Sequence, residues 1–300
     1  MTDPVLNPLQ SVPPAASEVR ASAFARHWSL EATRPSAADI SSIGEILPRG
    51  TPVYLSAVPT QSYDEHVEAA ARLRAAGLEP VPHVAARRHG DRKSFEEFIR
   101  RHAEKAGVRR VLVIAGDIDR PAGAFASALD VIGSGALQGN GITEIGIAGY
   151  PEGHPGITPD ELAKALDRKI EAAARGALRL NIVTQFCFDP QQIINWILWL
   201  RGRRIDVPVK VGLVGPTSLP TLLNYARRCG VKASARGLLQ RPGLLGSLVG
   251  EHGPQPIIDA LLKAPEDVGE ISPHFFSFGG VTKTAQFAQA AAQSGFAFRP

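Results

Sequence analysis

The amino-acid sequence predicts a single-domain α/β protein with the (β/α)8 fold, the TIM barrel. Two observations support this prediction. Short apolar runs alternate with helical patterns along the 300 residues, and near-continuous apolarity is typical of strands buried on both faces of a parallel sheet. Helical patterns also end repeatedly in a glycine that an apolar run follows at once, and such a glycine supplies the left-handed turn that ends a helix. These glycines are Gly77, Gly107, Gly176 and Gly230.

Eight apolar runs are the predicted strands. They are Trp28–Ala32, Pro52–Val58, Val81–Ala85, Arg110–Ala115, Glu144–Gly149, Leu180–Phe186, Val207–Val214 and His274–Phe278. Eight strands alternating with helices in one chain favour a closed barrel. An open doubly wound sheet is the alternative, although the Gly-rich dinucleotide fingerprint of that fold is absent after the first strand. The clearest helix start is the capping box from Thr158 to Glu161, with Pro159 at the first helical position.

Composition narrows the classes of protein. No stretch of about 18 apolar residues occurs, so we expect no membrane span. The net charge is +4, and the basic residues form no long block that would indicate a nucleic-acid patch. A small anionic ligand fits this charge as well, and a solvated surface is the alternative. Cys187 and Cys229 have neither metal-ligand spacing nor a disulfide framework, so we expect a reducing cytoplasm and no metal site. We predict a flexible tail over residues 1–20, rich in Pro, Ser and Ala, and the barrel domain over residues 21–300.

Polar residues gather at the predicted carboxyl ends of the strands, where barrels of this type form their active sites. They are Glu31, Ser56, His83, Asp117, Tyr150, His154 and Gln185. Glu31 lies in a mostly apolar run, and burial there should raise its pKa, as suits a general acid. Its alternative role is an ion pair with Arg34.

Two further strand ends carry groups that suit a heterocyclic ligand. Gly116 lets a ligand approach the backbone closely next to Asp117, although a helix-capping aspartate is common at such a position. Gln185 can both donate and accept hydrogen bonds, so it can read the edge of a heterocycle.

Several segments together resemble the methylenetetrahydrofolate reductase family, from about residue 27 to residue 290. The most specific are Tyr150-Pro151-Glu152-Gly153-His154-Pro155, Asp167-Arg168-Lys169 and Thr184-Gln185-Phe186-Cys187-Phe188-Asp189, in the order and spacing of the family. Two shorter segments, Pro82-His83-Val84 and Ser29-Leu30-Glu31, are similar to family motifs.

The resemblance implies an enzyme of one-carbon metabolism that converts 5,10-methylenetetrahydrofolate to 5-methyltetrahydrofolate by hydride transfer, through FAD reduced by NAD(P)H. It implies that Glu31 is the acid that helps to open the five-membered ring to an iminium. Asp117 and Gln185 match residues that hold the pterin of the folate. The implied flavin contacts are Ser56, His83, Gly116, Phe125, Ala126, Tyr150, His154, Arg168 and Lys169. A solvated basic pair on a helix is the alternative for the last two.

Four positions depart from the family pattern. Ala115 stands where the family usually has Arg, Leu162 and Ala165 where it commonly has Asp and Asn, and Gly280 where we would align an arginine. Each change removes a polar group expected to contact the flavin. We therefore expect flavin binding to be weakened or lost, with hydride passing directly from the nicotinamide to the iminium.

Two other functions compete with this one. A barrel lyase or aldolase would usually have a strand-end lysine or a carboxylate–histidine metal set, and Lys210 is the only evident strand lysine. A non-catalytic folate-binding protein is the third hypothesis, but binding alone would not need the acid Glu31. A homo-oligomer stays open, with Trp196 and Trp199 as candidates for an interface or for the core.

Overall fold

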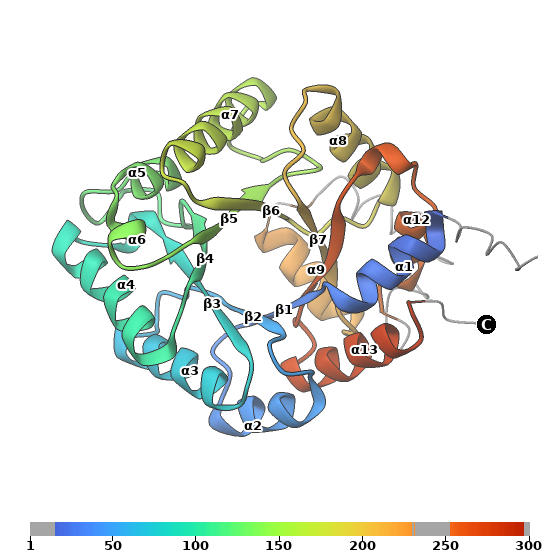
Figure 1. The fold of residues 1–300 in the computed structure, drawn as a ribbon, viewed down its shortest axis with the longest axis horizontal. Helices are drawn as coiled ribbons and strands as arrows, with labels where there is room; N and C mark the ends of the chain where they lie inside the picture. Colours follow the sequence, from blue (N-terminus) through green and yellow to red (C-terminus); the bar gives the residue numbers. More distant parts are fainter. Residues whose placement is uncertain (1–15, 230, 232–252, 297–300) are drawn as a thin grey trace, which may run out of the picture.

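The computed structural model describes residues 16–229, residue 231 and residues 253–296. Eight parallel strands form a closed barrel in sequence order, because the first strand pairs with the last as well as with the second. Helices surround the barrel as an outer ring (Figure 1). The predicted (β/α)8 fold is confirmed, and the open sheet is excluded. The strands are β1 (Ser29–Ala32), β2 (Pro52–Leu55), β3 (Glu79–Ala85), β4 (Arg110–Ile114), β5 (Glu144–Gly149), β6 (Arg179–Thr184), β7 (Val209–Val214) and β8 (Ile271–Phe276).

The described helices follow the strands in the expected alternation. They are α1 (Ala16–Arg26), α2 (Ala37–Ile46), α3 (Tyr63–Ala75), α4 (Arg92–Ala106), α5 (Ala128–Gly133), α6 (Ala136–Gly139), α7 (Pro159–Arg175), α8 (Pro190–Gly202), α9 (Leu219–Arg228), α12 (Gln255–Leu262) and α13 (Val281–Gln293), with the 3-10 turns η1 (Ala86–Arg88) and η2 (Glu266–Val268). The predicted capping box opens α7: the Thr158 hydroxyl accepts from the Glu161 amide, and the Glu161 carboxylate accepts from the Thr158 amide.

The glycines that were expected to end helices differ among themselves. Gly107, with φ of 60°, is the left-handed cap of α4, and Gly77 has φ of 84° just after α3. Gly176 has φ of −83°, and the left-handed residue there is Ala177, with φ of 50°. The expectation for Gly176 was therefore wrong by one residue. Gly230 lies outside the described residues.

The first described helix includes residues 16–20, which we expected in the tail; residues 1–15 lie outside the described part of the chain. Figure 1 shows α1 beside α12 and α13. The Arg20 guanidinium donates to four carbonyl oxygens at the end of α12 and just beyond, at 2.6–3.1 Å. Because the last carbonyls of a helix have no partner within it, this side chain completes the carboxyl end of α12.

We expect Arg20→Met to lower the free energy of unfolding by about 1–3 kcal/mol. Methionine keeps much of the apolar stem but leaves the half-buried carbonyl groups unpaired. Arg26→Met is the matched control, because the Arg26 side chain bonds to Ser22 within the same helix and is exposed. Urea unfolding followed by tryptophan fluorescence would measure both. Equal stability of the two variants would contradict a stabilising role for Arg20.

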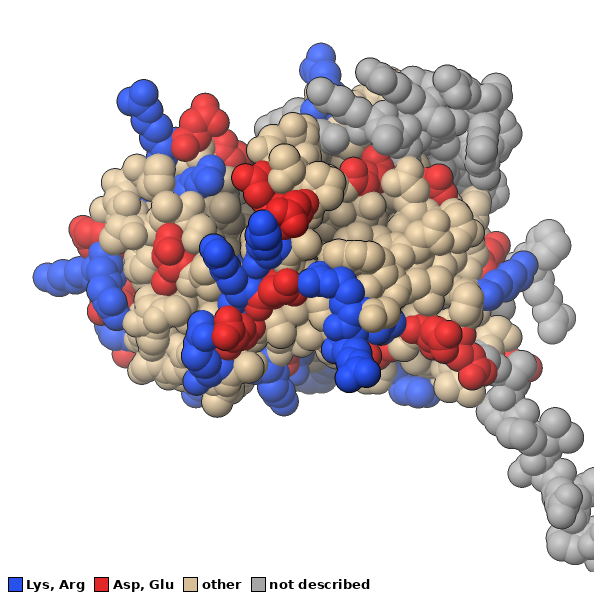
Figure 2. Space-filling view, turned by 90° about the horizontal axis from the view of Figure 1, so that it is seen from above, with Lys and Arg blue, Asp and Glu red and all other residues tan. Residues whose placement is uncertain are grey.

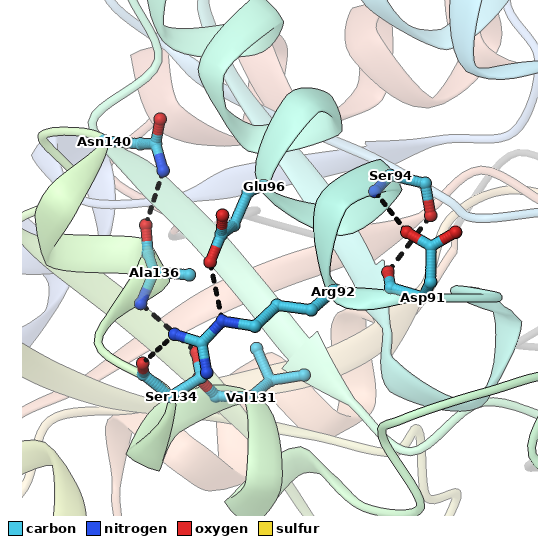
Figure 3. A network of polar contacts seen from close by, with 8 residues as sticks. All are labelled: Asp91, Arg92, Ser94, Glu96, Val131, Ser134, Ala136 and Asn140. Carbon is cyan, nitrogen blue, oxygen red and sulfur yellow. Dashed lines mark hydrogen bonds and ion pairs between the residues drawn. The ribbon is translucent and has the colours of Figure 1, made fainter.

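Another polar network fixes the start of α4 against the α5–α6 segment (Figure 3). Asp91 caps α4 by accepting from the Ser94 amide. Arg92, in the first turn, binds Glu96 of its own helix at 2.7 Å and the Ser134 carbonyl at 2.7 Å. The network lies in the outer ring of helices and holds the segment that follows β4.

Two apolar clusters make up the core. The larger fills the space between the strands and the helices. The smaller lies inside the barrel and consists of Tyr54, Val81, Leu112 and Val183. In-register residues of parallel neighbours point to the same face, and Glu31 is in register with Tyr54, which is in register with Val81. Glu31 therefore points into the barrel.

Candidate active site

The Glu31 carboxyl group lies between side chains from three other strands of the barrel. The Ser56 hydroxyl, just after β2, donates to Glu31 Oε1 at 2.8 Å. His83 of β3 and His274 of β8 each place Nε2 3.5 Å from Glu31 Oε2, a distance that allows electrostatic attraction without a well-formed hydrogen bond. Glu31 is 13% exposed, His83 8% and His274 0%. Arg34, the alternative partner of Glu31, instead bonds to Thr60 and lies 3.8 Å from Glu65.

The two histidines have different surroundings. The His274 side chain is fully buried, and its Nδ1 lies 2.9 Å from the hydroxyl of buried Ser29. His83 lines a cavity of about 270 Å³ between the β2–α3, β3–α4 and β4–α5 connections. The Tyr54 ring packs edge-on against both imidazoles, with centroids 6.2 Å and 4.7 Å away. The Tyr54 ring and the strands of the barrel together hold the Glu31 carboxyl group at the mouth of the barrel.

The expectation of a raised Glu31 pKa was wrong. Burial acts to raise that pKa, but His83, His274 and the Ser56 hydroxyl outweigh it and hold the pKa below its ordinary value. Burial lowers the pKa of His83 and of His274, although Glu31 opposes the shift in both. The site therefore holds a carboxylate beside two imidazoles that resist protonation.

Asp117 lies beside this cavity rather than against Glu31. Its exposed side chain forms an ion pair with Arg88 of η1, and Arg88 lines the 270 Å³ cavity together with His83. Gly116 adopts φ of 95°, and a Cβ placed there would lie 3.3 Å from the Ala85 Cβ. Glycine thus allows the β4–α5 connection to pass close to the end of β3.

A larger cavity, of about 650 Å³, lies beside the ends of β4 and β5. Its wall contains three predicted cofactor residues, Tyr150, Arg168 and Lys169. Burial lowers the Lys169 pKa to about 8. Leu162 and Ala165, two departures from the family pattern, lie in the same wall. The cations suit the phosphates of a dinucleotide, whereas the side chains at 162 and 165 cannot hydrogen-bond to a ribose or an adenine.

The remaining predicted residues occupy three places. Gln185, Tyr150 and His154 line a small pocket next to the larger cavity, and the Gln185 amide oxygen accepts from the Phe186 backbone at 3.1 Å. Phe125 is buried against Phe95, with ring centroids 4.8 Å apart. Ala126 is exposed, and its carbonyl accepts from Arg87, which lines the larger cavity.

Sequence reasoning missed three residues of the site: His274, Tyr54 and Arg88. His274 was placed at the start of its predicted strand, whereas β8 begins three residues earlier and contains Pro273. The signal that could have found it is the alternation along β8, since Ser272, His274 and Phe276 share the inward face. Trp196 and Trp199, the candidates for an interface, both line the larger cavity.

The lysine expected of a barrel lyase does not lie at this site. Lys210 is the second residue of β7, at the amino end of the barrel. Among the described residues, no group of three or more His, Cys, Asp and Glu side chains could hold a metal ion.

Comparison with known proteins supports the resemblance. The model of the methylenetetrahydrofolate reductase family matches residues 38–236, about two thirds of the chain, and the protein belongs to this family. Methylenetetrahydrofolate reductase 2 of Saccharomyces cerevisiae is 29% identical over 136 residues, 42% of this chain and 22% of the yeast protein. Methylenetetrahydrofolate reductase 1 of Schizosaccharomyces pombe is 30% identical over 139 residues, 44% of this chain and 22% of that protein. The matched region thus spans about a fifth of each relative.

A solved structure of an uncharacterised Clostridium thermocellum protein, described as binding two copies of 5-methyl-5,6,7,8-tetrahydrofolic acid, shares the fold. The TM-score is 0.57 at 12% sequence identity, over 93% of this chain and 99% of that one.

The surface has mixed charge. In Figure 2, Lys and Arg side chains alternate with Asp and Glu over the face shown. In the described parts of the chain, no helix combines the length and the apolar character needed to span a bilayer.

Proposed function

We propose that the protein interconverts 5,10-methylenetetrahydrofolate and 5-methyltetrahydrofolate by hydride transfer, with Glu31 as the general acid and NAD(P)H as the hydride donor. The observation that carries this proposal is the position of Glu31, held by His83, His274 and Ser56 at the barrel mouth of a chain from this family. Family membership supports the folate chemistry, and the Glu31 geometry supports the proton chemistry. We infer a cytoplasmic location from the cysteine pattern noted in the sequence.

The proposed acid acts when the folate covers the mouth of the barrel. Glu31 starts as a carboxylate, because its pKa lies below the ordinary value. A bound folate would displace water from the partly exposed carboxyl group, and this added burial raises the pKa toward the range that a general acid needs. Protonated Glu31 then gives its proton to the folate nitrogen that leaves as the five-membered ring opens. In this proposal Asp117 and Gln185 orient the pterin through its polar edge.

The donor is proposed to bind without a flavin. A nicotinamide dinucleotide supplies the hydride, and its phosphates would meet Arg168 and Lys169 in the 650 Å³ cavity. Leu162 and Ala165 support the loss of flavin, since they place apolar groups in the wall where the family commonly has Asp and Asn. Ala115, also in that wall, removes a further polar contact.

Anaerobic incubation of the purified protein with NADH and methylenetetrahydrofolate, with and without added FAD, tests the reaction and the donor together. We expect oxidation of NADH and formation of 5-methyltetrahydrofolate at rates that FAD leaves unchanged. We also expect no absorbance near 450 nm from the purified protein. A stoichiometric yellow flavin would refute the flavin-free route, and no methyl product under either condition would refute the reaction.

A further inference from the structure

Glu31, the proposed general acid, needs a supply of protons while folate is bound. In the proposed function each reduction transfers one proton from Glu31 to the folate, and the lowered pKa of Glu31 makes it a carboxylate at the start of the cycle. The proton must therefore arrive after the folate has bound, when the mouth of the barrel is covered. Direct contact of Glu31 with bulk water is then blocked, so a path through the protein side is needed.

Three side chains contact the Glu31 carboxyl group: Ser56, His83 and His274. The Ser56 hydroxyl bonds to the exposed Thr33 hydroxyl, just after β1, at the same mouth of the barrel that the folate would cover. His274 is fully buried, its second ring nitrogen faces the Ser29 hydroxyl, and it does not line the 270 Å³ cavity. His83 also faces Glu31 through Nε2, but its side chain forms part of the wall of the 270 Å³ cavity. The cavity reaches the molecular surface, because its rim includes the exposed residues Pro59 and Ser62.

We propose that His83 and the 270 Å³ cavity form the route by which Glu31 regains its proton during catalysis. His83 is a relay residue that acts through Glu31, while His274 positions the carboxyl group. The proposal rests on the proposed function, because it assigns the proton source of that same reaction.

The proposed step moves one proton and no electrons. A water molecule in the cavity gives a proton to His83 Nδ1, and the Nε2–H proton passes to Glu31 Oε2. The carboxylate becomes a carboxylic acid, the cavity water becomes hydroxide that takes a proton from bulk solvent, and the imidazole changes tautomer. The imidazole returns to the first tautomer by losing the Nδ1 proton to cavity water and gaining a proton at Nε2 from water that enters when the product leaves, which completes the cycle.

The groups around His83 suit a neutral imidazole that accepts a proton and passes one on. Glu31 from β1, Tyr54 from β2, His274 from β8 and His66 from α3 are the ionisable groups that face it. Burial lowers the pKa of the imidazole, so the ring is neutral and has a lone pair to accept a proton. His66 does not give the proton a second path to solvent, because its Nδ1 lies 3.0 Å from His102 Nε2 and both rings are buried.

Chemical rescue tests the relay directly. We expect His83→Ala to lower kcat by about 100-fold, and added imidazole to restore much of it in a concentration-dependent way. Imidazole can enter through the cavity and occupy the space of the deleted ring. His274→Ala is the matched control: it removes the other histidine that contacts Glu31, but its site is sealed, so imidazole should not restore its activity.

His83→Gln provides a second test in a variant that keeps a polar side chain next to Glu31. The amide cannot pass a proton from one end to the other, so kcat should fall about as far as in His83→Ala, by about 100-fold, with little change in KM. The solvent deuterium isotope effect on kcat should also rise, because proton delivery becomes limiting.

The outcomes separate the relay from the function on which it rests. Wild-type kcat in His83→Gln, failure of imidazole to rescue His83→Ala, or equal rescue of His83→Ala and His274→Ala would refute the relay in an otherwise active enzyme. A wild-type protein that produces no 5-methyltetrahydrofolate would instead refute the proposed function.

Discussion

Glu31→Gln is expected to lower turnover by a factor of about 10²–10⁴, while folate affinity changes little. Glutamine keeps the size of the side chain, and its amide oxygen can still accept from the Ser56 hydroxyl, as Glu31 Oε1 does. It cannot give a proton to the leaving nitrogen of the folate. Steady-state rates with NADH and methylenetetrahydrofolate measure the first effect, and fluorescence titration with 5-methyltetrahydrofolate measures the second.

Glu144→Gln is a suitable control for this prediction. Glu144 begins β5, at the opposite end of the barrel from Glu31, and lies 3.3–3.4 Å from Arg110 and Arg179. Its replacement removes a carboxylate from the barrel without removing any contact of the Glu31 carboxyl group, so turnover of the folded variant should stay near the wild-type value. Undiminished turnover in Glu31→Gln would remove the acid from the mechanism. Equal losses of affinity and turnover would favour a folate-binding role.

The second large effect concerns stability in acid. Burial is the main cause that lowers the pKa of His66 and of His89 from 6.5 to about 4, and that of His102 to about 3. The unfolded chain takes up protons at these histidines below about pH 6.5, whereas the folded protein does so only near pH 4 for His66 and His89 and near pH 3 for His102. Stability is therefore greatest above pH 6.5 and is lost as the pH falls toward 4. Each histidine contributes a slope of up to about 1.4 kcal/mol per pH unit.

Proton uptake by the unfolded chain at three such histidines can remove much of the stability of an ordinary domain as the pH falls by two units. Urea unfolding at several values between pH 7.5 and pH 5 would measure the slope, above the range in which carboxylates such as Glu31 titrate. His102→Gln should reduce this slope by up to about 1.4 kcal/mol per pH unit, the contribution of one histidine. This holds whatever the substitution does to stability at neutral pH. A free energy of unfolding that is independent of pH over this range would contradict the prediction.

The fold could be predicted because its signals are local. The apolar runs and the capping box of α7 depend on neighbouring residues, and the eight strands were all found within a few residues of their ends. The register of closure between β1 and β8 depends on the whole barrel, and it is this pairing that brings His274 to Glu31. The sequence alone could not supply that contact, so the direction of the Glu31 pKa shift was missed.

The site was predictable in part for the same reason. Position at a strand end identified Glu31, Ser56 and His83, and these three lie together. Motif resemblance identified Arg168 and Lys169, and both line the larger cavity. Phe125 shows the limit of a residue-by-residue match, because its ring packs into the core against Phe95 rather than into that cavity.

The separation of the two cavities has a consequence for the evolution of this barrel. In the described part of the chain, no residue lines both the 650 Å³ cavity and the 270 Å³ cavity, and the groups that contact the Glu31 carboxyl lie outside the wall of the larger one. Substitutions at Leu162 and Ala165 can therefore arise without altering a contact of the Glu31 carboxyl group. Under the proposed function, the part of the barrel that would bind the electron donor can evolve separately from the part that would carry the proton.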